Sequence, residues 1–587
     1  MDLKSIPPLQ YDLNDFQKDI LEECLKKKNG GLSIPMGSGK TIIALVLSLL
    51  LPNIDDEEKV LVCCSKTLLK SWEIEIKKFF GENADNYYYT YYDKNIKNSK
   101  QKINNVKFVL TTPAVFVKQY TNYNIEEYIV NYMQDSRNRI VKNYTIPRTH
   151  VLSQSLDNNL LYSTNWKCLV IDEIQNYTNI ETKICKALIS VSTRYRWGTS
   201  GTIISEPSKE RILGYHLLIN EPFFPTNLPE TETYLCSAKF KGINSTLVSR
   251  TENKAYKEPK MNVNIISHSL TNQEIDIYKM MKRLFERIHD IIMDHKDIAA
   301  NLAYKIKYER ALNRHNVTNQ EERDQNDVDL LAAQYTVRMY SSGLLGMIVY
   351  LRQSIVSPLI PLSSALLDLC DIKTKSNIAE LIFEYLKEHQ IYEHLNDPSL
   401  CKSSRITEII NVIEKKLQGK KIIIYNSFRT CLNLIDKYVQ DETGRKTYII
   451  KDNSTVMQRQ KIIDDFKNDQ TGVLMLTYQI GSEGLNLQFC DSMLLTDFWW
   501  NSNTTNQAIA RINRYGQMSN ELNVYFFTSN TAIESAILNK QSDKKELVNE
   551  LLLGRYSKKV KKMTVNDIVN IVTGEENLNE LKKIYNI

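Results

Sequence analysis

The chain carries one loop whose residue types suit phosphate chemistry, Pro35-Met36-Gly37-Ser38-Gly39-Lys40-Thr41. It follows a short apolar segment, residues 31–34, and precedes a helix-like apolar run, residues 42–51. Glycines allow backbone N–H groups to approach phosphate oxygens, and the N-terminus of the following helix adds a favourable dipole. We therefore predict a strand, a phosphate-binding loop and a helix. In this site Gly37, Ser38 and Gly39 cradle phosphates, Lys40 reaches the β- and γ-phosphates, and Thr41 holds Mg²⁺.

The loop departs from the full pattern at one position, where Ile34 stands in place of a glycine. A fortuitous glycine turn is therefore the alternative interpretation of this segment.

Two acidic residues follow a second apolar run, residues 166–171. A buried parallel strand of this kind delivers its last side chains to the carboxyl edge of a sheet, where ligands bind in α/β folds. Asp172 is then expected to hold Mg²⁺, and Glu173 to orient and deprotonate the attacking water. A strand followed by an acidic turn is the alternative, which the phosphate loop upstream disfavours. Together the two segments predict a site that hydrolyses ATP.

A third segment, residues 507–517, carries Arg511 and Arg514. Because residues three apart share one face of a helix, we predict a helix that turns both guanidinium groups toward a cleft. Arginine is planar and permanently charged, and one that reaches the γ-phosphate can raise the rate by about 10³–10⁵-fold. An exposed basic helix is the alternative.

In order and spacing these motifs resemble those of superfamily 2 helicases, and within them the Snf2-like group. Shorter stretches complete the series, at residues 13–18, 60–65, 69–72, 108–112, 196–202, 420–427 and 477–487. The second part of the arginine segment, Arg511-Ile512-Asn513-Arg514-Tyr515-Gly516-Gln517, is more typical of the Snf2-like group than of other branches of the superfamily. The resemblance covers residues 13–540.

The resemblance implies further site residues. Gln17 is the amide that reads the adenine base, and Gln175, Gly484 and Gln507 belong to the nucleotide site. Nucleic-acid contacts are implied for Lys70, Thr111, Thr112, Ser427 and Thr477. The family more often has His where this chain has Gln175, near the interlobe cleft. That departure puts the coupling of hydrolysis to movement in question, and not the binding of metal.

A narrower similarity, in residues 36–43, is to ATPases of large DNA viruses that serve early transcription. Similar proteins occur on cytoplasmic linear plasmids of yeasts. The expected location is cytoplasmic if the chain comes from such a virus or plasmid, and nuclear otherwise.

Composition agrees with an ordinary soluble globular protein, since the 587 residues are 42% hydrophobic and 25% charged. The net charge of +6 is compatible with a nucleic-acid partner without indicating one. The 10 cysteines form no C-x-x-C pair, which favours reduced thiols in an intracellular protein over a disulfide framework or zinc site. The longest apolar stretch, residues 42–51, is far shorter than the ~20 residues of a membrane span, so no membrane partner is expected.

The fold class we predict is α/β, with two RecA-like parallel-sheet lobes, a helical insertion between them and a short helical C-terminal tail. The boundaries are residues 1–245 for the first lobe with an insertion at 118–163, 246–375 for the interlobe helical region, 376–542 for the second lobe, and 543–587 for the basic tail. The polar run at residues 313–327 is expected to be a loop or disordered. ATP would lie in the cleft between the lobes, and the arginines would complete the site when the lobes close.

Three functions stay open at this point. The first is a translocase or helicase that moves on DNA, duplex or single-stranded, with RNA left open as a substrate. The second is the ATPase subunit of a transcription initiation or termination factor that works with RNA polymerase subunits. The third is a non-catalytic scaffold, which the intact set of five catalytic residues disfavours.

Overall fold

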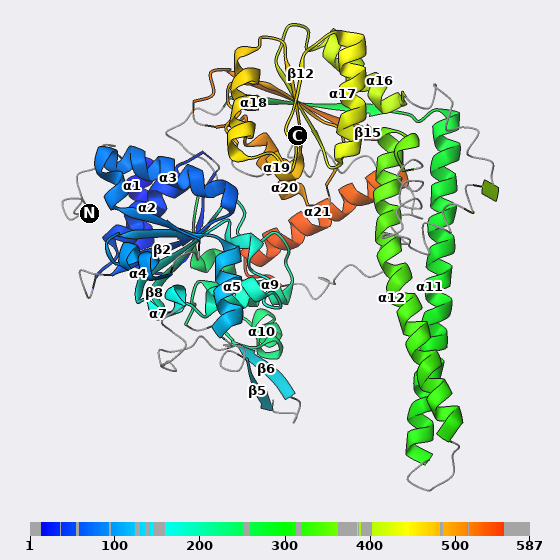
Figure 1. The fold of residues 1–587 in the computed structure, drawn as a ribbon, viewed down its shortest axis with the longest axis horizontal. Helices are drawn as coiled ribbons and strands as arrows, with labels where there is room; N and C mark the ends of the chain where they lie inside the picture. Colours follow the sequence, from blue (N-terminus) through cyan, green and yellow to red (C-terminus); the bar gives the residue numbers. More distant parts are fainter. Residues whose placement is uncertain are drawn as a thin grey trace.

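The computed structural model describes residues 13–35, 37–53, 58–92, 96–123, 130–134, 140–144, 159–222, 224–250, 259–312, 320–361, 384, 387–388, 402–481, 485–499, 501–514 and 516–556. Two parallel sheets form two α/β lobes, which confirms the predicted fold class (Figure 1). Among the described helices, none is both long and apolar enough to cross a membrane.

The first lobe is built on a sheet of seven parallel strands in the order β3-β4-β2-β7-β8-β1-β9. The strands are β1 (Gly30–Ser33), β2 (Lys59–Cys63), β3 (Tyr88–Tyr91), β4 (Phe108–Thr111), β7 (Trp166–Asp172), β8 (Thr193–Ser200) and β9 (Leu247–Ser249). Every residue of β2, β4 and β7 is buried, as expected for parallel strands covered on both faces. The order places β7, β8 and β1 side by side, so the loops after these three strands meet at one edge.

Helices cover both faces of the first sheet and form one apolar core on each. One core contains residues of α1 (Asp15–Lys27), α2 (Lys40–Leu50) and α3 (Lys66–Phe80). The other contains residues of α4 (Ile96–Asn104), α5 (Pro113–Tyr123), α7 (Leu160–Ser163), α8 (Lys183–Ile189), α9 (Lys209–Leu218) and α10 (Leu228–Leu235). Short 3₁₀ turns are η2 (Gly81–Asn86), η4 (Ile174–Asn176) and η5 (Ile243–Thr246). From the expected insertion, β5 (Val130–Gln134) and β6 (Ile140–Tyr144) pair antiparallel, beside α10 in Figure 1.

The second lobe has six parallel strands in the order β10-β15-β14-β11-β13-β12. They are β10 (Lys260–His268), β11 (Ile422–Asn426), β12 (Thr447–Ile449), β13 (Val473–Thr477), β14 (Ser492–Leu495) and β15 (Glu521–Ser529). Its helices are α16 (Ser404–Lys415), α17 (Arg429–Thr443), α18 (Val456–Asn468), α19 (Tyr478–Gly481) and α20 (Ser502–Ile509). Every residue of β11 and β13 is buried.

The region expected to be helical between the lobes, residues 246–375, is not helical throughout. β9 belongs to the first sheet, and β10 pairs along its full length with β15 in the second. The long helices α11 (Asn272–Leu312) and α12 (Gln320–Val356) are therefore inserted into the second lobe after its first strand. Figure 1 shows them as an antiparallel pair, in green, that extends away from both lobes.

The polar run expected to be a loop, residues 313–327, is helical from Gln320 onward, so this expectation was wrong for its second half. Residues 313–319 lie outside the described part of the chain. Glutamate, glutamine and arginine favour the helix, which explains why a polar composition did not interrupt it.

The last described helix, α21 (Ala532–Leu552), links the two lobes (Figure 1). Ile533, Ile537 and Leu538 near its start are part of the core of the second lobe. Leu551 at its end is part of the core of the first. The expected tail boundary at residue 543 falls within this helix, and residues 557–587 lie outside the described residues.

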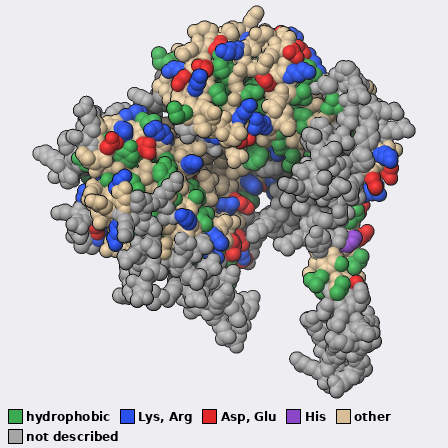
Figure 2. Space-filling view, viewed as in Figure 1, with side chains coloured by type: hydrophobic (Ala, Val, Ile, Leu, Met, Phe, Trp, Pro, Cys, Tyr) green, Lys and Arg blue, Asp and Glu red, His purple; other side chains and the backbone are tan. Residues whose placement is uncertain are grey.

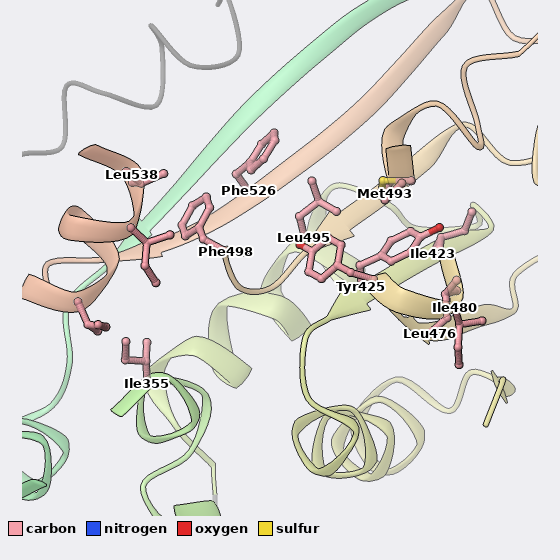
Figure 3. Packing of buried hydrophobic residues seen from close by; sticks show 14 of the residues in the cluster. Ile355, Ile423, Tyr425, Leu476, Ile480, Met493, Leu495, Phe498, Phe526 and Leu538 are labelled. Atoms are coloured by element: carbon pink, nitrogen blue, oxygen red, sulfur yellow. The ribbon is translucent and has the colours of Figure 1, made fainter. Parts of the chain in front are cut away.

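The core of the second lobe joins the sheet to the helical insertion and to α21 (Figure 3). Phe498 and Phe526 stack with ring centroids 6.2 Å apart. Ile355 of α12 and Leu538 of α21 belong to the same buried cluster. The insertion and the linking helix are thus packed onto the lobe that carries the predicted arginines.

Candidate nucleotide site between the lobes

The predicted phosphate loop connects β1 to α2, as the sequence indicated. Gly37 and Gly39 have φ angles of 81° and 84°, a region that favours glycine. A Cβ atom on Gly39 would lie 2.6 Å from Nε2 of Gln17. The backbone conformation therefore favours glycine at position 39, and a larger residue would also displace the Gln17 amide. Ser38 is buried in this loop.

Gln17, the predicted adenine reader, lies buried beside the loop in the first turn of α1. Its Oε1 accepts a hydrogen bond from the backbone N–H of Asn14 (3.2 Å), and Oδ1 of Asn14 accepts one from the backbone N–H of Gln17 (2.9 Å). This capping box fixes the amide against the phosphate loop. Recognition of the base by Gln17 remains a prediction.

Lys40 begins α2, and its ammonium group donates to the carbonyl oxygens of Ile34 (3.2 Å) and Pro35 (3.4 Å). Burial lowers its pKa, and the nearby carboxylates of Glu173 and Asp172 oppose that shift. Lys40 therefore lies within electrostatic range of both acidic residues. The Thr41 side chain is half-buried in the first turn of the same helix.

Asp172 ends β7 beside Thr199 of β8. Its Oδ2 accepts a hydrogen bond from Nε1 of Trp72 (2.9 Å), and its Oδ1 accepts one from the Thr199 hydroxyl (2.7 Å). Burial and the adjacent Glu173 raise the pKa of Asp172, while these two hydrogen bonds and Lys40 favour the ionised form. These hydrogen bonds hold the carboxylate in one orientation, and a cation placed near it would stabilise its ionised form.

Glu173 follows in the left-handed conformation, with φ 52° and ψ 51°. This conformation is uncommon for a residue with a side chain and clusters at functional sites. Oε2 of Glu173 accepts hydrogen bonds from Nε2 of Gln175 (2.6 Å) and from the Ser200 hydroxyl (3.3 Å). The predicted base is therefore held by a neighbour in its own turn and by the end of β8.

The donor set fits a magnesium ion. Asp172 supplies a carboxylate at the end of β7, and Thr41 supplies a hydroxyl in the first turn of α2, which follows β1 at the same edge of the sheet; both are the hard oxygen ligands that Mg²⁺ prefers. Oδ1 of Asp172 accepts hydrogen bonds from the Thr199 hydroxyl and from the backbone N–H of Glu173 (3.1 Å), whereas Oδ2 keeps a second lone pair beyond the Trp72 bond. No group of three metal-binding His, Cys, Asp or Glu side chains occurs among the described residues.

Arg511 and Arg514 lie on the second lobe and reach the same site electrostatically. Burial lowers the pKa of Arg511, and Glu173 and Asp172 partly offset this effect. Burial and the neighbouring Arg511 lower the pKa of Arg514 to about 9, and Glu173 again opposes the shift. Nε of Arg511 donates to the carbonyl of Gly481 (2.9 Å), which anchors this guanidinium group in its own lobe.

The prediction that both arginines share a helix was wrong, because α20 ends at Ile509 and both follow it in consecutive turns. After α20 the backbone is bonded to distant segments, and the carbonyl of Arg511 accepts a hydrogen bond from the N–H of Leu487 (3.3 Å). Nε2 of Gln517 donates to the carbonyls of Ile512 (3.0 Å) and Cys490 (3.0 Å), so the backbone turns back toward β14 instead of continuing the helix. Gln507 is half-buried on α20, and Gly484 lies outside the described residues.

The nucleic-acid candidates of the first lobe differ in accessibility. Lys70 is exposed on α3 and pairs with Glu73 (3.4 Å). Thr111 is fully buried, and its hydroxyl donates to the carbonyl of Tyr91 (2.8 Å), so this hydroxyl is committed to the core. Thr112 is buried before α5, and its carbonyl accepts from the N–H of Val115 (3.0 Å).

In the second lobe, Ser427 and Thr477 follow or end the neighbouring strands β11 and β13 at one sheet edge. Sequence reasoning assigned no role to Arg352, whose guanidinium group donates to Ser427 Oγ (2.9 Å) and to Asp497 Oδ2 (2.8 Å). It also lies over the ring of Phe428, 4.7 Å from the centroid. This buried cation positions the Ser427 loop, and only its place in a recognisable motif could have indicated it.

On the face shown in Figure 2, Lys and Arg side chains are interspersed with Asp and Glu over both lobes. The mixture agrees with the small net charge of +6. A net charge this small does not by itself provide a strong overall attraction for an anionic polymer.

Models of known protein families match both halves of the chain. The SNF2-related domain matches residues 20–328, more than half of the chain, and the helicase conserved C-terminal domain matches residues 402–516. A helicase-like protein, 172L of Invertebrate iridescent virus 6, is 25% identical over 91% of this chain and 86% of its own length.

Cellular relatives match over shorter stretches. Transcription termination factor 2 of Drosophila melanogaster is 29% identical over 33% of this chain and 18% of its own length. The DNA repair protein RAD5 of Mycosarcoma maydis is 30% identical over 28% of this chain, which spans 12% of that relative. Among solved structures, the SWI2/SNF2 ATPase core of Sulfolobus solfataricus in complex with dsDNA is 19% identical, with 97% of this chain and 98% of that chain covered and a TM-score of 0.34.

The SNF2-related match spans the phosphate loop and both acidic residues, and the C-terminal match spans the two arginines. The chain therefore belongs to the SNF2-related family of helicase-type ATPases.

Proposed function

We propose that this protein hydrolyses ATP in the cleft between its lobes and couples hydrolysis to movement along DNA. One observation carries the proposal: two arginines of the second lobe interact electrostatically with the acidic pair beside the phosphate loop of the first. Such a site is complete only when both lobes contribute. A change at the γ-phosphate can therefore alter how the lobes sit relative to each other.

The proposed chemistry uses residues from both lobes. Lys40 binds the β- and γ-phosphates, and Glu173 takes a proton from the attacking water as its oxygen bonds to the γ-phosphorus. The bond from that phosphorus to the bridging oxygen of ADP breaks, which releases ADP and inorganic phosphate. Arg514, with Arg511 behind it, stabilises the charge that builds on the γ-phosphoryl oxygens. A Mg²⁺ ion held by Thr41 and Asp172 would neutralise phosphate charge.

DNA is the proposed track, supported by membership of the family and by relatives named for DNA repair. Lys70, Thr112, Ser427 and Thr477 are the proposed contacts, at the carboxyl edges of the two sheets. Thr111 is the weakest candidate, because its hydroxyl is buried and bonded within the core. Binding through such contacts is mainly to phosphates and should weaken steeply with salt.

A strand-displacement assay tests the proposal. The protein should displace the third strand of a triplex in the presence of ATP and leave a forked duplex paired, as expected of a motor that moves without unwinding. Efficient ATP-dependent separation of the forked duplex would make it a true helicase instead. An ATPase rate indifferent to duplex DNA, single-stranded DNA and RNA would refute movement on nucleic acid.

A second function is supported by the relative named transcription termination factor 2. The same motor would then act beside an RNA polymerase, and in the cytoplasm if the gene is carried by a cytoplasmic virus, as the viral relative suggests. Co-purification of polymerase subunits with the tagged protein would support this function. ATP-dependent release of a stalled polymerase from DNA would separate it from simple translocation.

A further inference from the structure

We propose that Gln175 is a positioning residue, which fixes the Glu173 carboxylate so that Oε1 is the oxygen that takes the proton from water. The inference rests on the proposed ATPase chemistry. It assigns to Gln175 a role different from contact with the nucleotide.

Two side chains donate hydrogen bonds to the same carboxylate oxygen of Glu173. Nε2 of Gln175 donates to Oε2 at 2.6 Å, and the Ser200 hydroxyl reaches the same oxygen at 3.3 Å. Ser200 has a single proton, and its hydroxyl also lies 3.0 Å from the carbonyl of Thr202. Gln175 is therefore the dedicated donor, and Oε1 is the oxygen that these two contacts leave for chemistry.

The orientation of the Gln175 amide follows from charge. With Nε2 toward Glu173, a donor meets a carboxylate, whereas the flipped amide would place two acceptor oxygens against each other. In the observed orientation Oε1 of Gln175 is buried and has no hydrogen-bond donor among the described residues. A buried acceptor without a donor costs folding free energy, so the amide is better suited to the function than to stability.

The backbone at this position is held without help from the side chain. The carbonyl of Gln175 accepts hydrogen bonds from the Thr178 hydroxyl (3.2 Å) and from Nη1 of Arg211 (3.5 Å). Replacing the amide should therefore leave the turn in place and release only the carboxylate of Glu173.

The test measures ATP turnover and thermal unfolding of the full chain with Gln175→Met, a side chain of similar length with no donor. The turnover number should fall about 10–100-fold, as for other losses of positioning. The KM for ATP should stay within about twofold, because phosphate contacts are untouched. The unfolding midpoint should be unchanged or higher, because a buried acceptor without a donor has been removed. Gln175→His, which restores an N–H donor, should recover much of the turnover.

Gln119→Met is the matched control. This glutamine is also buried, but both ends of its amide are bonded: Nε2 donates to the Tyr91 hydroxyl (2.6 Å) and Oε1 accepts from the N–H of Leu161 (3.0 Å). Its replacement should lower the unfolding midpoint and preserve turnover, the reverse of the result expected at Gln175.

Normal turnover in Gln175→Met would overturn the inference. A parallel fall in turnover and in the unfolding midpoint would overturn it as well, if Gln175→His does not restore turnover. Glu173→Gln separates this failure from failure of the proposed function. If Glu173→Gln is inactive while Gln175→Met is normal, only the positioning role is lost. If Glu173→Gln itself hydrolyses ATP, the assignment of the base is wrong.

Discussion

At the scale of single residues, the phosphate loop and the acidic pair have different tasks. Lys40→Ala should abolish hydrolysis and weaken ATP binding, because no other lysine lies in the loop. Glu173→Gln should also stop hydrolysis but retain bound ATP, since the phosphate contacts survive while the base is lost. Parallel measurements of hydrolysis rate and nucleotide affinity check both. A Lys40→Ala protein that keeps more than about a tenth of the wild-type rate would argue against the phosphate-loop assignment.

Removal of one partner from a buried ion pair should strongly destabilise the second lobe. Arg405 and Glu534 form two hydrogen bonds, of 2.7 and 2.8 Å, and both side chains are buried. Glu534→Gln leaves a buried guanidinium group without its counter-charge and should lower the free energy of unfolding by about 3–5 kcal/mol. The control is Glu442→Gln, in the partly exposed pair with Lys402, which should cost at most about 1 kcal/mol. Equal losses in urea unfolding would contradict this difference.

His216 should make the first lobe sensitive to acid. Burial lowers its pKa from 6.5 to about 4, and the ring stacks on Phe224 with centroids 3.6 Å apart. Between these two pH values the unfolded chain binds a proton that the folded chain does not, so the free energy of unfolding must fall as pH falls. From pH 6.5 to pH 5 this histidine should account for about 2 kcal/mol of that loss. In urea titrations at both pH values, His216→Gln should show a smaller loss than the wild type, and an equal loss would exclude this origin.

Residue types and spacing gave candidate site residues where the signals are local. The glycines of the loop, the run before Asp172 and the pair Arg511 and Arg514 each lie within about ten residues of sequence. The pair formed by Arg405 and Glu534 could not be predicted, because 129 residues separate its partners. The hydrogen bond from Gln175 to Glu173 was equally hidden, since the choice of partner depends on how the turn folds.

At the scale of elements, the sequence predicted β1, α2 and β7 from apolar runs. It missed β10, whose half-exposed strand lacks a continuous apolar run and depends on pairing with β15 far along the chain. It also extended the helix of the arginines too far, because the contact that ends the helix comes from Gln517 and the distant Cys490 carbonyl. Tertiary contacts decided both differences.

The junction between α21 and the first lobe depends on a close backbone contact. Gly242 has a φ of 83°, and a Cβ there would lie 2.3 Å from the carbonyl oxygen of Leu552 and 2.5 Å from the nitrogen of Gly554. Gly242→Ala should therefore lower the free energy of unfolding by more than backbone strain alone, by about 1–3 kcal/mol in addition. Gly444→Ala is the control, with a φ of 62° and nothing within 4 Å of its Cβ, so it should cost about 1–2 kcal/mol. Similar losses in the two variants would mean that the end of α21 is not packed tightly on the first lobe.

At the scale of the whole molecule, the two lobes are connected through α21 and through the nucleotide site. The phosphate loop and acidic pair belong to one sheet, and the arginines belong to the other. Hydrolysis should therefore depend on the two arginines of the second lobe as well as on the residues of the first lobe.

The most direct test is the ATPase rate of Arg514→Ala with and without duplex DNA, beside measurements of ATP and DNA affinity. The wild-type rate should rise with DNA, and the variant should lose about 10³-fold or more in turnover while its affinity for both ligands stays nearly unchanged. A variant that hydrolyses ATP at the wild-type rate would contradict the claim that the second lobe completes the site. A variant that loses DNA binding instead would place Arg514 at the nucleic acid and not at the γ-phosphate.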